Sequence, residues 1–350
     1  MTPVARNGRT RSWRARRSGA SDPNRRRQER PRQRADKIVQ MPDSHLSSVD
    51  RLIRQLQLEQ LDKDLFLGDP GPGMGRLFGG MVAAQAVMAA SNTVEPEKGN
   101  LHSLHAYFLR PGSHTAPIRY TVYRIRDGRT FTSRDVVAYQ GGEAIFSIST
   151  SFAVHEEGMD YQGPIPAAPA PGTLPNWEDV MREEMKEEVK QLGDAPTRWM
   201  RLHPIETKHA YPPKGGAAPG ELPSRKVWIR PKGELPPDPR IHTAFLVFAS
   251  DSGLLGTIAW GGSARPPGPQ GGRGNPMGYQ RMAASLDHSV WVHRTPNWDD
   301  WLLYHSESPV GFGARGLIFG GMYHQDGTRV VSVAQEGLVR DPRGRAAPKE

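Results

Sequence analysis

Two stretches of the chain are apolar on every side, and each predicts a buried central helix. Every residue over 244–249 is apolar, and a helix without a polar face cannot lie on a protein surface. Asp238 followed by Pro239 marks the start of this helix, because Asp caps free backbone N–H groups and Pro suits the first helical position. We therefore expect central helices over 81–94 and 240–255, each wrapped by a β-sheet.

Alternating apolar and polar residues follow each central helix and predict antiparallel strands. An amphipathic helix is expected before them, over 48–67, and a short charged helix over 177–192. The expected strand segments are 101–112, 117–140 with a turn at Asp127-Gly128, and 143–154 in the first half, and 282–294, 301–309, 314–325 and 328–340 in the second. Each half thus presents one central helix followed by about four strands.

A weak internal repeat relates the two halves. The dipeptide His-Ser begins a predicted strand at 102–103 and again at 288–289, and the last strands align at Ser147 and Ser332, 45 and 44 residues later. Matching order, spacing and turns indicate a duplication. The predicted fold class is α+β, with two tandem helix-and-sheet units whose sheets join edge to edge and so hide their edge strands.

Composition divides the chain further. Residues 1–45 carry a net charge of +9, which equals the charge of the whole chain, so the remainder is neutral. This argues against nucleic-acid binding by the folded body. The predicted organisation is a disordered basic tail (1–45), an N-terminal unit (46–155), a Pro/Gly-rich linker (156–225), a C-terminal unit (226–341) and a disordered end (342–350).

The basic tail admits two interpretations, a targeting or nucleic-acid segment and a plain solvated extension. No apolar run appears long enough to cross a bilayer. The chain has no cysteine, which excludes a disulfide framework, a Cys nucleophile and a thiolate metal site.

One carboxylate, Asp251, lies inside the second predicted central helix. Burying a charge is costly unless something pairs with it or uses it, so Asp251 is a candidate catalytic group. The alternative is that it merely ends the helix beside Gly253. A glycine-rich loop, whose glycines fit neither the dinucleotide nor the P-loop spacing, opens onto the first central helix at Gly79 and Gly80. Such an entrance suits close approach of another group to backbone N–H donors.

Six segments together resemble the type II acyl-CoA thioesterases, the double-hotdog enzymes of bacteria and peroxisomes. They are RLFGGMVAAQAV, LHSLHAYFLRPG, RDGRTFTSRDVVAYQ, SLDHSVWVHR, LLYHSESP and VAQEGLVR. The resemblance spans about 48–340, except the linker and the Pro/Gly-rich loop near residue 265. It implies a double hotdog, hydrolysis of fatty acyl-CoA thioesters to free fatty acid and CoA, and no metal or organic cofactor.

The resemblance also implies a set of site residues. Its catalytic Asp, Thr or Ser, and Gln match Asp251, Ser285 and Gln335 in this sequence, and together they would hold a water molecule. The resemblance at the glycine-rich entrance implies that Gly79, Gly80 and Met81 bind the substrate. This chain departs from the family pattern at two of these positions, with Met81 where Gln is frequent and Ser285 where Thr is frequent. The serine keeps the hydroxyl, whereas Met81 removes an amide.

Other chemistries stay open at this point. A non-catalytic acyl-CoA or lipid binder would keep the same fold, and hotdog folds also host acyl-CoA dehydratases, which need a His–Asp pairing. Asp287 and His288 are adjacent on a strand and should point to opposite faces, so His288 is interpreted as structural. The same holds for His102, His105 and His293, whose spacing indicates no metal site.

The resemblance suggests a peroxisomal protein, but the chain ends in Ala-Pro-Lys-Glu rather than a Ser-Lys-Leu-type signal. The Arg-rich start leaves a mitochondrial or cytoplasmic location open. Acyl-chain length and homo-oligomer formation are likewise open on the sequence.

Overall fold

The computed structural model describes residues 45–73, 75–193, 198–210, 222–259 and 282–340. The expected disordered tails therefore lie outside the described residues, apart from His45. Within this part of the chain the helices are α2 (Ser48–Leu56), α3 (Gly79–Ser91), α4 (Trp177–Glu184), α5 (Lys186–Leu192), α6 (Arg198–Leu202), α7 (Pro239–Asp251) and α8 (Gly256–Ala259). Short 3-10 turns occur at Pro96–Lys98 and Pro171–Thr173.

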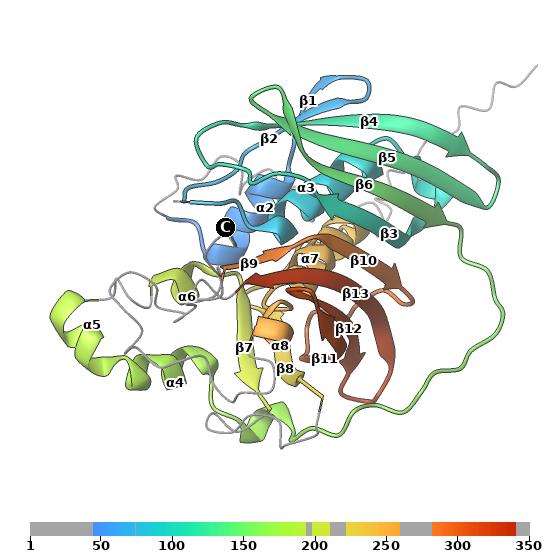
Figure 1. Ribbon diagram of the computed structural model, residues 1–350. Coiled ribbons are helices and arrows are strands. Elements are labelled where there is room, and N and C mark those ends of the chain that lie inside the picture. Colours follow the sequence, from blue (N-terminus) through green and yellow to red (C-terminus); the bar gives the residue numbers. More distant parts are fainter. Residues whose placement is uncertain (1–44, 74, 194–197, 211–221, 260–281, 341–350) are drawn as a thin grey trace, which may run out of the picture.

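One antiparallel sheet contains all the strands of the described residues (Figure 1). The first half contributes β1 (Glu59–Asp62), β2 (Leu65–Gly68), β3 (Asn100–Phe108), β4 (Ile118–Asp127), β5 (Phe131–Gln140) and β6 (Glu143–Ala153). The second contributes β7 (Ile205–His209), β8 (Ser224–Pro231), β9 (Met282–Ser285), β10 (Asp287–Val292), β11 (Leu302–Phe312), β12 (Arg315–His324) and β13 (Arg329–Arg340). The order is β1-β2-β4-β5-β6-β3-β10-β13-β12-β11-β8-β7, with β9 also paired to β13.

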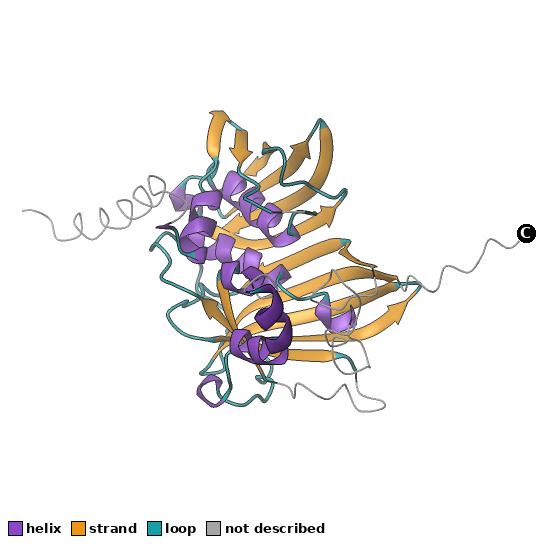
Figure 2. Cartoon of the chain, turned by 90° about the vertical axis from the view of Figure 1, so that its left-hand side faces the viewer, coloured by secondary structure: helices purple, strands orange, loops and turns teal. Residues whose placement is uncertain are grey.

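The two halves meet where β3 pairs with β10, with Leu104 opposite Val290. This pairing satisfies the backbone groups that each sheet would otherwise expose at its edge. The sheet curves around the helices, and α3 and α7 pack against each other inside it (Figure 2). Each half is a central helix wrapped by an antiparallel sheet, and the chain is a double hotdog, as the sequence predicts.

The central helices are as apolar and as buried as the sequence pattern requires. In α3 every residue from 82 to 91 is buried, and in α7 every residue from 243 to 251 is. Asp238 caps α7 by accepting from the backbone N–H of Arg240. The stretch Pro239–Ile258 is long and apolar enough to cross a membrane, contrary to the sequence-based expectation, yet 72% of its most apolar window is buried inside the protein. It is the core of the C-terminal half.

Two predicted helices end or break earlier than the sequence pattern indicates. The helix expected over 48–67 ends at Leu56, and β1 and β2 follow it. The apolar residues beyond the helix end serve the sheet instead, since Phe66 is fully buried on β2 and pairs with Tyr120 of β4. The predicted 156–225 linker contains helices α4 to α6, but it also contains β7, which pairs with β8 and extends the C-terminal sheet. The helix expected over 177–192 is broken at Met185 into α4 and α5.

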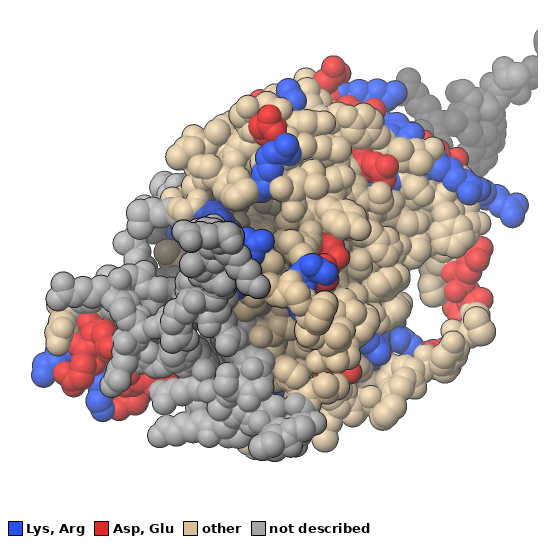
Figure 3. Space-filling model, viewed as in Figure 1, with Lys and Arg blue, Asp and Glu red and all other residues tan. Residues whose placement is uncertain are grey.

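Charged side chains of both signs are interspersed over the visible face of the protein (Figure 3). This distribution fits the neutral charge of the sequence outside the basic tail.

Arg134 on β5 is a fully buried cation, and it ties the end of α3 to the sheet. It donates to Thr93, just beyond α3, through Nε at 2.9 Å, and forms an ion pair with Asp127. We expect Arg134→Met to lower the free energy of unfolding by about 2–3 kcal/mol, because buried acceptors lose a charged donor. Urea unfolding measures this, with the exposed Arg129→Met as control. Equal stability of the two variants would contradict the anchoring role.

Candidate active site

Asp251 is the last residue of α7, and the end of the helix aims its side chain at the junction of the two halves. Ser252 leaves the helical conformation and Gly253 adopts a positive φ of 72°, the conformation that commonly ends a helix. Both readings of Asp251 from the sequence thus describe the same place, since the residue ends the helix and also faces a cavity. Only 7% of Asp251 is exposed.

Three hydrogen-bond donors surround the Asp251 carboxylate. The backbone N–H of Gly80, in the first turn of α3, and the side-chain amide of Gln335 donate to it, and Ser285 Oγ lies 3.5 Å from Oδ1. Burial raises the pKa of Asp251, although these donors and the nearby His288 partly offset the effect. A carboxyl with a raised pKa is a better proton acceptor than an exposed one.

Ser285 and Gln335 come from neighbouring strands, β9 and β13. Gln335 is fully buried, and its Nε2 donates to Ser285 Oγ at 2.9 Å. The fold therefore brings together the three catalytic candidates named from the sequence. Asp251 and Ser285 reach the cavity, whereas Gln335 lies behind them and holds both.

His288 completes this network from β10. Its Nδ1 lies 2.6 Å from Gln335 Oε1 and its Nε2 lies 2.7 Å from Ser250 Oγ. Burial lowers the pKa of His288, so the ring is neutral and donates its Nδ1 proton to the Gln335 carbonyl. This contact fixes which end of the amide faces Ser285 and Asp251. Asp287 points elsewhere and accepts from the backbone N–H of Glu336 at 2.7 Å.

The link between His288 and Gln335 was missed on the sequence. The link depends on the pairing of β10 with β13, in which Ser289 lies opposite Ala334. That register sets His288 beside Gln335. The other histidines interpreted as structural bond to serines on neighbouring strands, His102 to Ser151, His105 to Ser289 and His293 to Ser332. In the part of the chain that the structure describes, no group of three or more His, Asp or Glu residues could hold a metal ion.

A cavity of about 640 Å³ opens in front of Asp251 and Ser285. Gly79, one of the predicted substrate-binding positions, lines it. Gly80 acts through its N–H on Asp251, and Met81 packs against the hydrophobic core without lining the cavity. Two exposed guanidinium groups, of Arg76 and Arg110, line the solvent side. The α3 N-terminus faces this cavity without a side-chain cap.

Gly79 is needed where the entrance of α3 approaches the carboxylate. A Cβ at this position would lie 2.5 Å from the Phe108 ring and 3.0 Å from Asp251 Oδ2. We expect Gly79→Ala to lower the rate of the reaction about 10-fold to 100-fold, because small displacements of reacting groups carry such costs. Steady-state kinetics measure it, and Gly172→Ala, where a Cβ meets nothing within 4 Å, is the control. An unchanged rate would show that the carboxylate does not act from this position.

The comparisons with known proteins agree with this fold. Residues 69–153 match the family model described as the acyl-CoA thioesterase N-terminal domain, and residues 203–338 match the acyl-CoA thioesterase model. The chain is 34% identical to acyl-CoA thioesterase 2 of Haemophilus influenzae over 83% of its own length and 98% of that protein. It is 34% identical to human acyl-coenzyme A thioesterase 8, with 81% and 87% covered.

A solved structure gives the same result. The acyl-CoA thioesterase II TesB2 of Mycobacterium marinum is 33% identical, with a TM-score of 0.65 over 84% of this chain and 99% of that one. The fold and site thus define a double-hotdog protein of the thioesterase class. The chain belongs to the type II acyl-CoA thioesterase family.

Proposed function

We propose that this protein hydrolyses fatty acyl-CoA thioesters to free fatty acid and CoA, with a water molecule held by the set Asp251, Ser285 and Gln335, in which Gln335 acts through the other two. The observation that carries the proposal is a buried carboxylate at a cavity, hydrogen-bonded to two side chains that are not ionised. Membership of the acyl-CoA thioesterase family supports the same reaction.

In this mechanism Asp251 is the general base. Its carboxylate takes a proton from water while the water oxygen attacks the thioester carbonyl carbon. The tetrahedral intermediate then collapses, the C–S bond breaks, and the CoA sulfur leaves with the proton that Asp251 took from the water. The positive end of the α3 dipole, at Gly79, favours the negative charge that grows on the carbonyl oxygen.

The roles of Ser285 and Gln335 follow from their hydrogen bonds. Ser285 both donates and accepts, so it can orient the water at the cavity wall. Gln335, fully buried, holds Ser285 and Asp251 in place and acts on the water through them. His288 is a positioning residue for Gln335.

The CoA portion of the substrate carries phosphate groups, and the solvent side of the cavity suits them. Arg76 and Arg110 both line it there, and guanidinium groups bind phosphate through paired N–H donors. Arg110 also forms an ion pair with Glu143 at 3.0 Å, which orients its side chain. We therefore place the CoA phosphates at this rim.

The dehydratase alternative requires a histidine at the reacting carbon. His288 is fully buried and does not line the cavity, with both ring nitrogens hydrogen-bonded to protein groups. The binder alternative is separated by experiment. Thiol release from acyl-CoA, followed with a thiol-reactive dye, should saturate with substrate and require no added metal. Tight acyl-CoA binding without thiol release would overturn the proposal, and hydration of an enoyl-CoA would point to the other reaction.

A further inference from the structure

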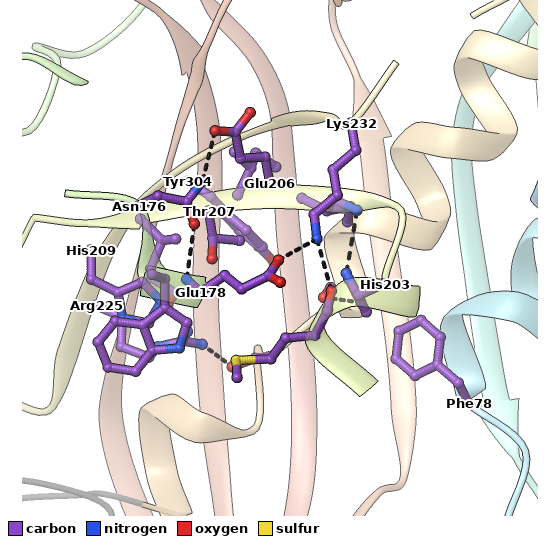
Figure 4. A pocket seen from close by; sticks show the side chains of 18 residues that line it. Phe78, Asn176, Glu178, His203, Glu206, Thr207, His209, Arg225, Lys232 and Tyr304 are labelled. Atoms are coloured by element: carbon purple, nitrogen blue, oxygen red, sulfur yellow. Dashed lines mark hydrogen bonds and ion pairs between the residues drawn. The ribbon is translucent and has the colours of Figure 1, made fainter. Parts of the chain in front are cut away.

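A second cavity, of about 280 Å³, adjoins the proposed active site in the C-terminal half. It lies between the C-terminal sheet, at β7 and β8, and helix α4. Phe78 and Gly253 line this cavity and also the one that contains Asp251. Figure 4 shows Phe78 at one end of it, with His209 and Arg225 toward the opposite end. The two cavities therefore meet within two residues of the catalytic candidate.

The walls of this second cavity are apolar along much of their length. Val227 and Ile229 of β8 line one wall, and Ile205 of β7 and Met200 of α6 lie beside them, all four buried. His203 also lines it, and burial lowers the pKa of His203 to about 4, so its ring is neutral at ordinary pH. The His203 ring donates from Nε2 to Ser252 Oγ at 3.3 Å, next to Asp251.

The cavity is lined by two carboxylates, Glu178 and Glu206, and by two cations, Arg225 and Lys232. Glu178 of α4 lies 2.9 Å from Lys232, and Glu206 lies 2.6 Å from Arg230. Asn176, which caps α4, donates to Glu206 at 2.7 Å. These bonds hold α4 over the cavity and balance its charges, so no single net charge is left to select an ionic ligand.

We propose that this cavity holds the acyl chain of the substrate. The chain would pass Phe78 and Gly253, while the thioester stays at Asp251 and the CoA portion stays in the larger cavity. This inference rests on the proposed function and adds a division of the substrate between two cavities. Each methylene that leaves water contributes about 0.8 kcal/mol, or about fourfold in kcat/KM.

The far end of the cavity sets a limit on chain length. There Trp177 of α4 stacks on His209 of β7, with ring centroids 3.8 Å apart and planes 5° apart. An acyl chain that reaches the Trp177–His209 pair has no further room along the cavity. kcat/KM should therefore rise with each added methylene and then stop rising at one length.

The test is a ladder of saturated acyl-CoAs, from acetyl-CoA to palmitoyl-CoA, assayed with matched valine variants. Val227→Phe fills the proposed cavity, so kcat/KM for long chains should fall by roughly tenfold or more. Acetyl-CoA should be hydrolysed within a few-fold of wild type. Val310→Phe, on the exposed part of β11, should leave the ladder unchanged. Val82→Phe makes the same change in the wall of the larger cavity.

If Val82→Phe lowers kcat/KM for long chains and Val227→Phe does not, the inference is overturned and the acyl chain lies in the larger cavity. Trp177→Ala tests the same point from the other end, without adding volume to the core. It should move the preferred chain to a longer one, and an unmoved preference would count against the proposal even if Val227→Phe fails to fold. If the wild-type protein releases no thiol from any acyl-CoA of the series, the proposed function itself is refuted.

Discussion

Asp251→Asn is expected to bind acyl-CoA and to hydrolyse it about 10²- to 10⁴-fold more slowly than wild type, because the variant keeps the shape of the side chain and loses the proton acceptor. Steady-state thiol release gives kcat, and isothermal titration with a non-hydrolysable acyl-CoA analogue gives binding. The exposed Asp299→Asn is the control. A near wild-type kcat would leave Asp251 as the end of a helix and nothing more.

The same variant has an expected signature in pH. Burial raises the pKa of Asp251, so wild-type kcat/KM should fall as pH drops through that raised value, and this limb should be missing from the residual activity of the variant. A folded-state pKa above the unfolded one means that ionising Asp251 costs stability, and the cost grows as pH rises. Asp251→Asn should therefore gain melting temperature relative to wild type at neutral pH and lose that advantage near pH 4.

Gln335→Ala is expected to lower kcat about 10-fold to 100-fold, because Asp251 and Ser285 both lose the donor that holds them. The three groups act on one water, so their effects should be far from additive. After Asp251→Asn, removal of Gln335 or of the Ser285 hydroxyl should cost little more. A full additional loss in the double variant would show that Gln335 acts independently of the carboxylate.

His288→Leu should reproduce the loss of kcat seen in Gln335→Ala, with KM nearly unchanged. The reason is that the amide of Gln335 loses the donor that fixes its orientation. Combined with Gln335→Ala it should have little further effect on kcat, and thermal melts run in parallel show whether each variant stays folded. The control is His105→Leu, an exposed histidine on the neighbouring strand β3 that bonds to Ser289 of β10.

Much of the fold could be predicted because it rests on local patterns. The two stretches with no polar face had to become buried helices, and the period-two strands had to cover them. The repeat at 102–103 and 288–289 matches the pairing of β3 with β10, where His105 lies opposite Ser289. The missed elements were those whose fate depends on distant partners. Phe66 falls within the helix predicted over 48–67, but its burial on β2 depends on pairing with β4.

The site divides in the same way. The sequence alone determined that a carboxylate, Asp251, would lie in a buried helix, and the family resemblance determined which Ser and Gln to consider with it. Tertiary structure decided the rest, because a hydrogen bond between strands depends on register. The β10–β13 register sets His288 against Gln335, and the end of α7 beside the start of α3 gives Asp251 the N–H of Gly80. The apolar cavity beyond Phe78 arises only where α4 folds over β7 and β8, since no local pattern of residues encodes an enclosed space.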